Sequence, residues 1–243
     1  NPSVVGECAA VANNLGQYIP LGVPDQTTFA GADYYVIALV QHREQLNSSL
    51  PAQGTLLREY VQLETPANAS WSKHIPLVNY LKDGTTIPAL MPDGTQAYAL
   101  DNPHYLGPII QANKDIPVRI VFYNLLPTGM AGDLFLPVDT TFMGSGMGPM
   151  TMTAPVDQGS VLDEIRNPAC GEANMDMMTR MDCFAQTRAT LHLHGGITPW
   201  ISDGTPHQWI TPANEMSNWP EGVAVRQVPD MVGLDRPAGV PDC

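Results

Sequence analysis

Short hydrophobic runs of β-forming residues, separated by turn signals, dominate the pattern of this chain. Four stretches read as strands, at 34–40, 60–63, 118–126 and 190–194. The apolar run at 118–126 is the clearest candidate for a buried strand. Residues 66–103 contain the turn dipeptides Asp83-Gly84 and Asp93-Gly94, so we expect hairpins or a decorated loop there.

The remaining segments carry little β pattern. Residues 1–30 are expected to form an extension, with one short helix at 8–15. Residues 143–185 read as a Met-rich insertion, and the chain after Trp209 reads mostly as loop. The 21 glycines and 23 prolines suit many turns and short strands better than long helices. The order of elements predicts an all-β Greek-key sandwich over 31–243, preceded by the extension.

Charge and hydropathy exclude several kinds of partner. The net charge of −13 makes nucleic acid and anionic membrane surfaces poor partners. The sequence has no apolar run long enough to span a membrane. It begins Asn1-Pro2-Ser3, with neither an initiator Met nor an apolar leader. We therefore expect a mature exported protein, periplasmic or secreted, although a trimmed chain would look the same.

The four cysteines do not form a Cys-x-x-Cys pair, which disfavours a zinc ribbon or a thioredoxin-type site. Cys170 and Cys183 bracket a polar, Met-rich stretch and could staple it. Cys8 and Cys243 lie near the two ends, and could pair with each other or with another polypeptide. An oxidising compartment fits this usage, and the pairing stays open.

Two histidines one residue apart carry the candidate chemistry. In a strand, His192 and His194 would project from one face, because side-chain direction repeats every second residue. Such a pair also arises by chance on a polar strand face. Gly195 and Gly196 favour the functional interpretation, because they allow close backbone approach behind the second imidazole. Neutral imidazole suits copper, zinc, iron and nickel, so the spacing indicates a metal site without selecting the metal.

The sequence around this pair resembles the first copper motif of bacterial multicopper oxidases of the spore-coat laccase and bilirubin oxidase type. Residues 189–200 read Ala-Thr-Leu-His-Leu-His-Gly-Gly-Ile-Thr-Pro-Trp, and 201–209 continue with Ile-Ser-Asp-Gly-Thr-Pro-His-Gln-Trp. Weaker upstream phrases resemble the same family in the same order, at 34–36, 57–60, 104–110, 118–127 and 136–141. The resemblance covers roughly residues 30–243.

This resemblance implies that residues 31–243 are a first cupredoxin domain that lacks its last strands. The family's first domain carries a second His-x-His, and nothing after Trp209 resembles it. A sandwich without its last strands exposes an unpaired sheet edge, which native proteins normally cover. We therefore expect a second polypeptide, or a missing remainder of the protein, to complete the sandwich and carry the remaining copper ligands.

The resemblance also implies roles for single residues. By motif position, His192 would ligate the type 2 copper and His194 one of the type 3 pair. Asp203 would be a carboxylate near the cluster that handles protons, the alternative being a turn residue of Asp203-Gly204. His207 is expected to be structural or to lie behind the ligands. The other histidines are expected to lie at the surface or to be hydrogen-bonded, namely His42, His74 and His104.

The leading hypothesis is therefore the N-terminal part or subunit of a laccase-like multicopper oxidase. Such an enzyme oxidises a phenol, a pigment or a metal ion, and reduces dioxygen to water at a trinuclear copper cluster. The type 1 copper is expected outside this chain, which alone would be inactive. The alternative is a non-enzymatic copper-binding or copper-delivery module that uses the histidine pair and thioether ligands. Eight methionines fall in the insertion, the other interpretation being that they pack a loop: Met143, Met147, Met150, Met152, Met175, Met177, Met178 and Met181.

Overall fold

The computed structural model describes residues 4–5, 8–9, 12–138, 185–195 and 209–215. The chain divides into two compact units, Asn1–Leu125 with Asp230–Cys243, and Leu126–Pro229. The described residues contain β-strands and two short 3-10 helices, with no α-helix among them, which confirms the all-β class. Nor does any described helix have the length and hydropathy needed to cross a membrane.

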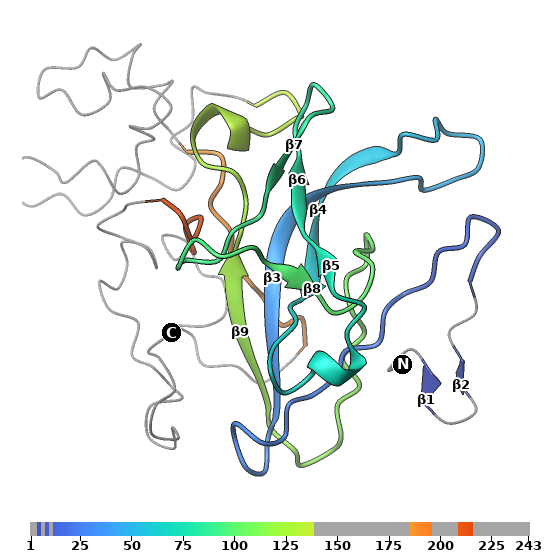
Figure 1. The fold of residues 1–243 in the computed structure, drawn as a ribbon, viewed down its shortest axis with the longest axis vertical. Helices are drawn as coiled ribbons and strands as arrows, with labels where there is room; N and C mark the ends of the chain where they lie inside the picture. The colour runs from blue at the N-terminus through green and yellow to red at the C-terminus, as the bar shows by residue number, and fades with distance from the viewer. Residues whose placement is uncertain (1–3, 6–7, 10–11, 139–184, 196–208, 216–243) are drawn as a thin grey trace, which may run out of the picture. The chain divides into compact units, whose positions relative to one another are not determined.

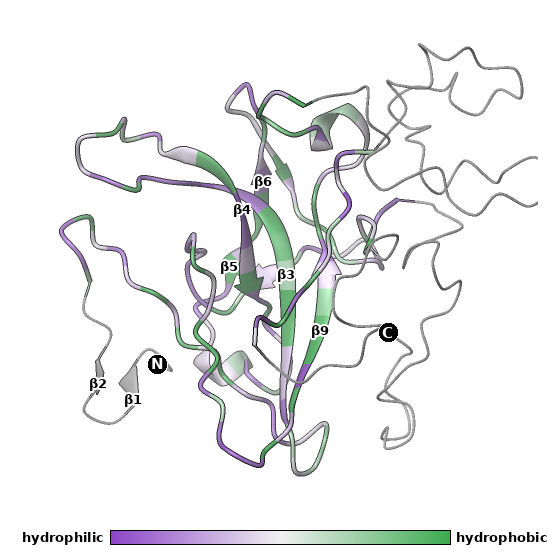
Figure 2. Ribbon diagram, turned by 180° about the vertical axis from the view of Figure 1, so that it is seen from behind, coloured by the Kyte–Doolittle hydropathy of each residue, from purple (hydrophilic) through white to green (hydrophobic). Residues whose placement is uncertain are grey.

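A mixed three-stranded sheet forms the centre of the first unit (Figure 1). Its middle strand, β3 (Asp33–Glu44), pairs antiparallel with β4 (Thr55–Gln62) and parallel with β9 (Val118–Asn124). Most residues of β3 are buried, as expected for a central strand covered on both faces. Figure 2 shows the hydrophobic stretches along β3 and β9. The predicted strands at 34–40, 60–63 and 118–126 are therefore confirmed, with longer limits for the first two.

Small two-stranded sheets and short helices make up the rest of the described secondary structure. The bounds of these elements are β1 Val4–Val5, β2 Cys8–Ala9, η1 Ala69–Trp71, β5 Ile75–Pro76, β6 Val78–Tyr80, β7 Thr86–Pro88, β8 Tyr98–Ala99 and η2 Gly129–Gly132. Strands pair as β1 with β2, β5 with β8 and β6 with β7. A helix at 8–15 is wrong: Cys8–Ala9 is a strand, and a turn follows in which Gly16 N donates to Asn13 O.

The two Asp-Gly dipeptides form the expected turns. Asp83 Oδ1 accepts hydrogen bonds from the backbone N and the hydroxyl of Thr85, and the turn joins β6 to β7. Asp93 accepts the same pair of bonds from Thr95, and here an isolated bridge joins Leu90 to Gln96. An Asp side chain that bonds to the backbone two residues ahead stabilises a turn locally, which is why the sequence predicts both sites.

The strand β9 differs from its prediction as a buried strand. Val118 and Ile120 are 37% and 46% exposed, and Tyr60 on the same sheet face is 41% exposed. Among the described residues β9 pairs only with β3, so it lies at one edge of this sheet. The opposite face is partly covered, since Phe29 contacts both Tyr34 and the guanidinium of Arg119. An apolar run alone cannot distinguish a central strand from an edge strand, because the strand's neighbour is set by distant residues.

Buried amide side chains take the place of strand neighbours at two points of this unit. Asn79 Oδ1 accepts a bond of 2.8 Å from Gln41 N, and its Nδ2 donates to Leu125 O at 2.8 Å. It thus fills the position where β9 leaves β3. Gln62 exchanges two similar bonds with the backbone of Val23, at 2.8 and 2.7 Å. Both amides satisfy backbone groups that would otherwise be buried without a partner.

Candidate metal centre

Four successive residues, 186–189, form an anchored base for the histidine pair. Gln186 Oε1 accepts from Leu134 N at 2.9 Å, and Thr187 is 1% exposed. Arg188 forms an ion pair with Glu215, and Ala189 exchanges two backbone hydrogen bonds with Ile210. Three residues of the base therefore contact segments distant in sequence and the fourth, Thr187, is buried, which fixes the point from which the chain continues to His192.

Beyond this base, the chain carries two imidazoles side by side. The rings of His192 and His194 have centroids 6.0 Å apart and planes tilted by 42°. Both residues are exposed, and Leu193 between them is 60% exposed. The pair is followed by Gly195 with φ of +78°, a conformation that glycine adopts without the penalty of other residues. The two rings lie close enough for a single metal ion, or two adjacent ions, to reach both.

The histidine segment is not the strand that the sequence predicts. Within the part of the chain that the structure describes, residues 190–194 have no strand pairing, and the nearest β-type contact is the isolated bridge between Ala189 and Ile210. A strand requires a ladder of backbone hydrogen bonds, and the described neighbours supply this ladder only at Ala189. The close placement of the two rings does not depend on a full strand.

The described part of the chain supplies only part of a metal coordination sphere. Among the described residues, no group of three or more His, Cys, Asp or Glu side chains is placed to hold a metal ion. Two neutral imidazoles are suitable donors for copper, and a copper ion requires further donors beyond them. The candidate residues Asp203 and His207 lie outside the described residues, as does the Met-rich insertion at 143–185. The two imidazoles are therefore compatible with part of a copper donor set, and the described residues add no third His, Cys, Asp or Glu to it.

The other three described histidines have local structural contacts. His74 Nδ1 lies 3.0 and 3.1 Å from the two carboxylate oxygens of Glu64, while its ring stacks on Tyr98. His104 is buried, and its Nδ1 accepts from Leu106 N at 3.2 Å. His42 packs edge-on against Tyr80, and burial lowers its pKa to about 4. The expectation of surface or hydrogen-bonded histidines thus holds for His74 and His104, whereas His42 is half-buried and packs against an aromatic ring.

Glu59 is a buried acid that the sequence pattern did not single out. It is 1% exposed, and neither of its carboxylate oxygens has a hydrogen-bond partner within the described structure. Burial, and next the negative charge of Glu44, raise the pKa of Glu59 to about 8. Its register partner is Val40, and it shares a sheet face with Leu57 and Val61. Its alternation with these apolar residues is the one signal in the sequence that places it on an inward face.

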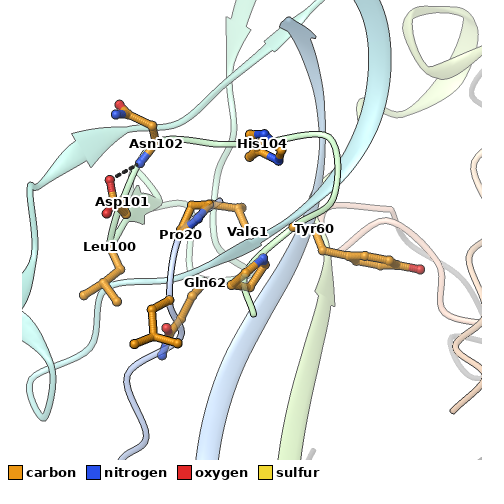
Figure 3. Close-up of a pocket in the computed structure, with 11 residues that line it drawn as sticks. Pro20, Tyr60, Val61, Gln62, Leu100, Asp101, Asn102 and His104 are labelled. Atoms are coloured by element: carbon orange, nitrogen blue, oxygen red, sulfur yellow. Dashed lines mark hydrogen bonds between the residues drawn. The ribbon is translucent and has the colours of Figure 1, made fainter. Parts of the chain in front are cut away.

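A small recess lies beside His104 in the first unit. Its lining includes Tyr60, Gln62, Asp101 and His104 (Figure 3). Its volume is about 10 Å³, which is roughly room for one water molecule. Figure 3 shows the Tyr60 ring directed away from the other labelled side chains. The recess is therefore too small to receive an organic substrate.

Comparison of the chain with protein-family models, curated proteins and solved structures finds no match.

Proposed function

We propose that this chain is the N-terminal part or subunit of a laccase-like multicopper oxidase, with a cupredoxin-like Greek-key sandwich completed by a second polypeptide or by the rest of the protein. The observation that carries the proposal is the pair of exposed imidazoles, 6.0 Å apart, at the end of an anchored segment. Their sequence context resembles the copper motif of that family. The all-β architecture of the described residues agrees with this fold class.

The incomplete donor set is central to the proposal. His192 and His194 contribute two nitrogen donors, and among the described residues no His, Cys, Asp or Glu side chain adds a third donor beside them. In the proposed assembly His192 holds the type 2 copper and His194 one type 3 copper. The second polypeptide contributes the remaining cluster ligands and the type 1 site. Exposure of both imidazoles is what such a shared site requires, because the partner must reach the same ions.

Copper supplies one-electron chemistry, through which the assembled enzyme couples oxidation of a phenol, pigment or metal ion to reduction of dioxygen to water. This chain's residues hold and orient the metal. Asp203 is assigned to proton handling, as the resemblance implies, since reduction of dioxygen to water consumes protons. The isolated chain is inactive in this scheme, and the protein acts in the periplasm or outside the cell.

Titration of copper into the 243-residue chain tests the ligand assignment. We expect Cu(II) to bind with an electron paramagnetic resonance spectrum that reports two imidazole nitrogens. The spectrum should lose one nitrogen in His192→Ala and one in His194→Ala. Leu193→Ala is the matched control, because Leu193 is exposed between the two ligands. Unchanged copper spectra in both histidine variants would refute the assignment.

A second experiment separates the oxidase from a copper-delivery module. Denaturing electrophoresis and mass analysis of native material should reveal a companion polypeptide, and reconstitution with it should restore oxygen consumption. One bound copper without oxygen consumption, even after reconstitution, would favour the delivery module instead.

A further inference from the structure

The ion pair between Arg188 and Glu215 is unusual for its burial and its position. Arg188 Nη2 lies 2.7 Å from Glu215 Oε1, and Arg188 Nη1 donates to Glu215 Oε2 at 2.8 Å. The two side chains are only 6% and 5% exposed. Such a two-pronged contact between a guanidinium and a carboxylate fixes relative orientation as well as distance.

Burial of both charges requires an explanation other than stability alone. Removing two charges from water carries a desolvation penalty that their attraction often fails to exceed, so an apolar pair of similar volume is frequently as stable. An apolar pair, however, does not fix the relative orientation of the two segments it joins. A forked ion pair has one preferred geometry, whereas apolar side chains can slide against each other.

The ion pair lies where a fixed orientation would matter for the two histidines. Arg188 lies four residues before His192, in the anchored base at 186–189. Glu215 lies just beyond the segment in which Trp209, Thr211 and Pro212 are buried. Between the two segments, Ala189 N donates to Ile210 O at 3.2 Å and Ile210 N donates to Ala189 O at 2.7 Å. The ion pair at Arg188 and these two bonds at the neighbouring Ala189 therefore join the segments 186–189 and 209–215.

We propose that Arg188 and Glu215 are positioning residues for the imidazole pair. Their two-pronged contact holds the base at 186–189 in one register against 209–215. It thereby sets the direction in which the chain runs from the base to His192 and His194. The assignment of these imidazoles as copper ligands rests on the proposed function, whereas their ordering by the ion pair does not. Neither Arg188 nor Glu215 touches the metal in this scheme.

The test uses the full chain with an apolar pair in place of the ion pair, Arg188→Met with Glu215→Leu. Nuclear magnetic resonance relaxation of the metal-free protein measures the order of the amides of His192 and His194. We expect backbone order parameters S² of about 0.85, typical of a rigid backbone, in the wild type. In the apolar variant we expect order parameters below about 0.6. We also expect about a tenfold weaker copper affinity, in the range seen when residues that orient metal ligands are replaced. The charge-reversed variant Arg188→Glu with Glu215→Arg should restore much of both properties.

A matched control removes an ion pair from the other unit. Lys73 Nζ lies 2.5 Å from Asp101 Oδ1, and Lys73→Met should leave both measurements unchanged. If the apolar variant fails to fold, Arg188→Lys replaces it, because lysine keeps the charge and loses the fork. Arg188→Lys should lower the amide order and the copper affinity less than the apolar pair.

The two proposals fail in different ways. Unchanged amide order in a folded apolar or Arg188→Lys variant would overturn the positioning role, as would low order in the wild type. A different outcome is loss of amide order in the apolar variant together with a copper spectrum that stays the same in His192→Ala and His194→Ala. That result would support the positioning role and refute the copper assignment on which the oxidase proposal rests.

Discussion

The central sheet of the first unit and the histidine segment of the second unit use polar side chains in opposite ways. In the sheet region, Asn79 and Gln62 are 1% and 4% exposed, and each bonds to backbone groups. In the histidine segment, His192 and His194 are exposed, and their rings lie together at the end of a buried base. Buried polar groups complete the fold in the sheet, whereas the two imidazoles are exposed at the protein surface. The comparison indicates that substitutions in the two regions should separate stability from function.

The largest expected effect is that of His194→Ala on the proposed oxidase, once the chain is combined with its proposed companion polypeptide. We expect oxygen consumption to be lost while reduction of the type 1 copper continues, because only the cluster loses a ligand. The free energy of unfolding should change by no more than about 0.5 kcal/mol, since the side chain is exposed. An oxygen electrode and optical titration of the type 1 site measure the two outcomes. Retained turnover would contradict the assignment.

Glu59→Gln tests how a buried polar group in the central sheet affects the pH dependence of stability. The folded pKa of about 8 exceeds the ordinary value of 4.5, so between these values the folded chain keeps a proton that the unfolded chain releases. The free energy of unfolding of the wild type should therefore fall as the pH rises from 4.5 to 8. At about 1.4 kcal/mol per pKa unit, the fall is bounded at roughly 4–5 kcal/mol. Urea unfolding over this pH range should show the fall in the wild type and lose this part of it in Glu59→Gln. An identical slope in both proteins would show that Glu59 is ionised normally.

Asn79→Ala should destabilise the first unit by about 2–4 kcal/mol, because Gln41 N and Leu125 O each lose a partner in a buried place. Asn79→Asp should cost at least as much, because the carboxylate can still accept from Gln41 N but places a second acceptor, and a buried charge, against Leu125 O. Asn113→Ala is the exposed control and should change little. Urea denaturation measures all three variants. Copper binding at the histidine pair should not change in any of them, and a parallel loss of copper affinity would break the proposed separation of roles.

The smallest effect compares two glycines with the same conformation in the two regions. Gly195 has φ of +78° and Gly94 has φ of +81°, and at either position an added Cβ meets no atom of the described residues within 4 Å. Alanine should therefore destabilise by about 1–2 kcal/mol at both sites, through backbone conformation alone. Only Gly195→Ala should also weaken copper binding, because it changes the backbone beside His194. Equal copper affinity in both variants would show that this turn does not help to place the imidazole.

The sequence predicts those features whose causes are local. The strands at 34–40 and 118–126 and both Asp-Gly turns follow from residues close together in the chain. The edge position of β9 depends instead on which strand lies beside it. The pairing of Arg188 with Glu215, 27 residues apart, and the burial of Glu59 depend likewise on distant contacts. The histidine spacing predicts that two imidazoles lie together, but the wrong expectation of a strand there shows that spacing does not determine backbone pairing.

Asn79 also acts as a stop between two parallel strands. β9 cannot extend its pairing along β3 past Leu39 without expelling the amide from Gln41 N. Nor can β9 withdraw without stripping Leu125 O of its bond to the same side chain. The Asn79 amide thus opposes slippage of β9 along β3 in both directions. The length of the ladder between these two strands is set by a residue that belongs to neither of them.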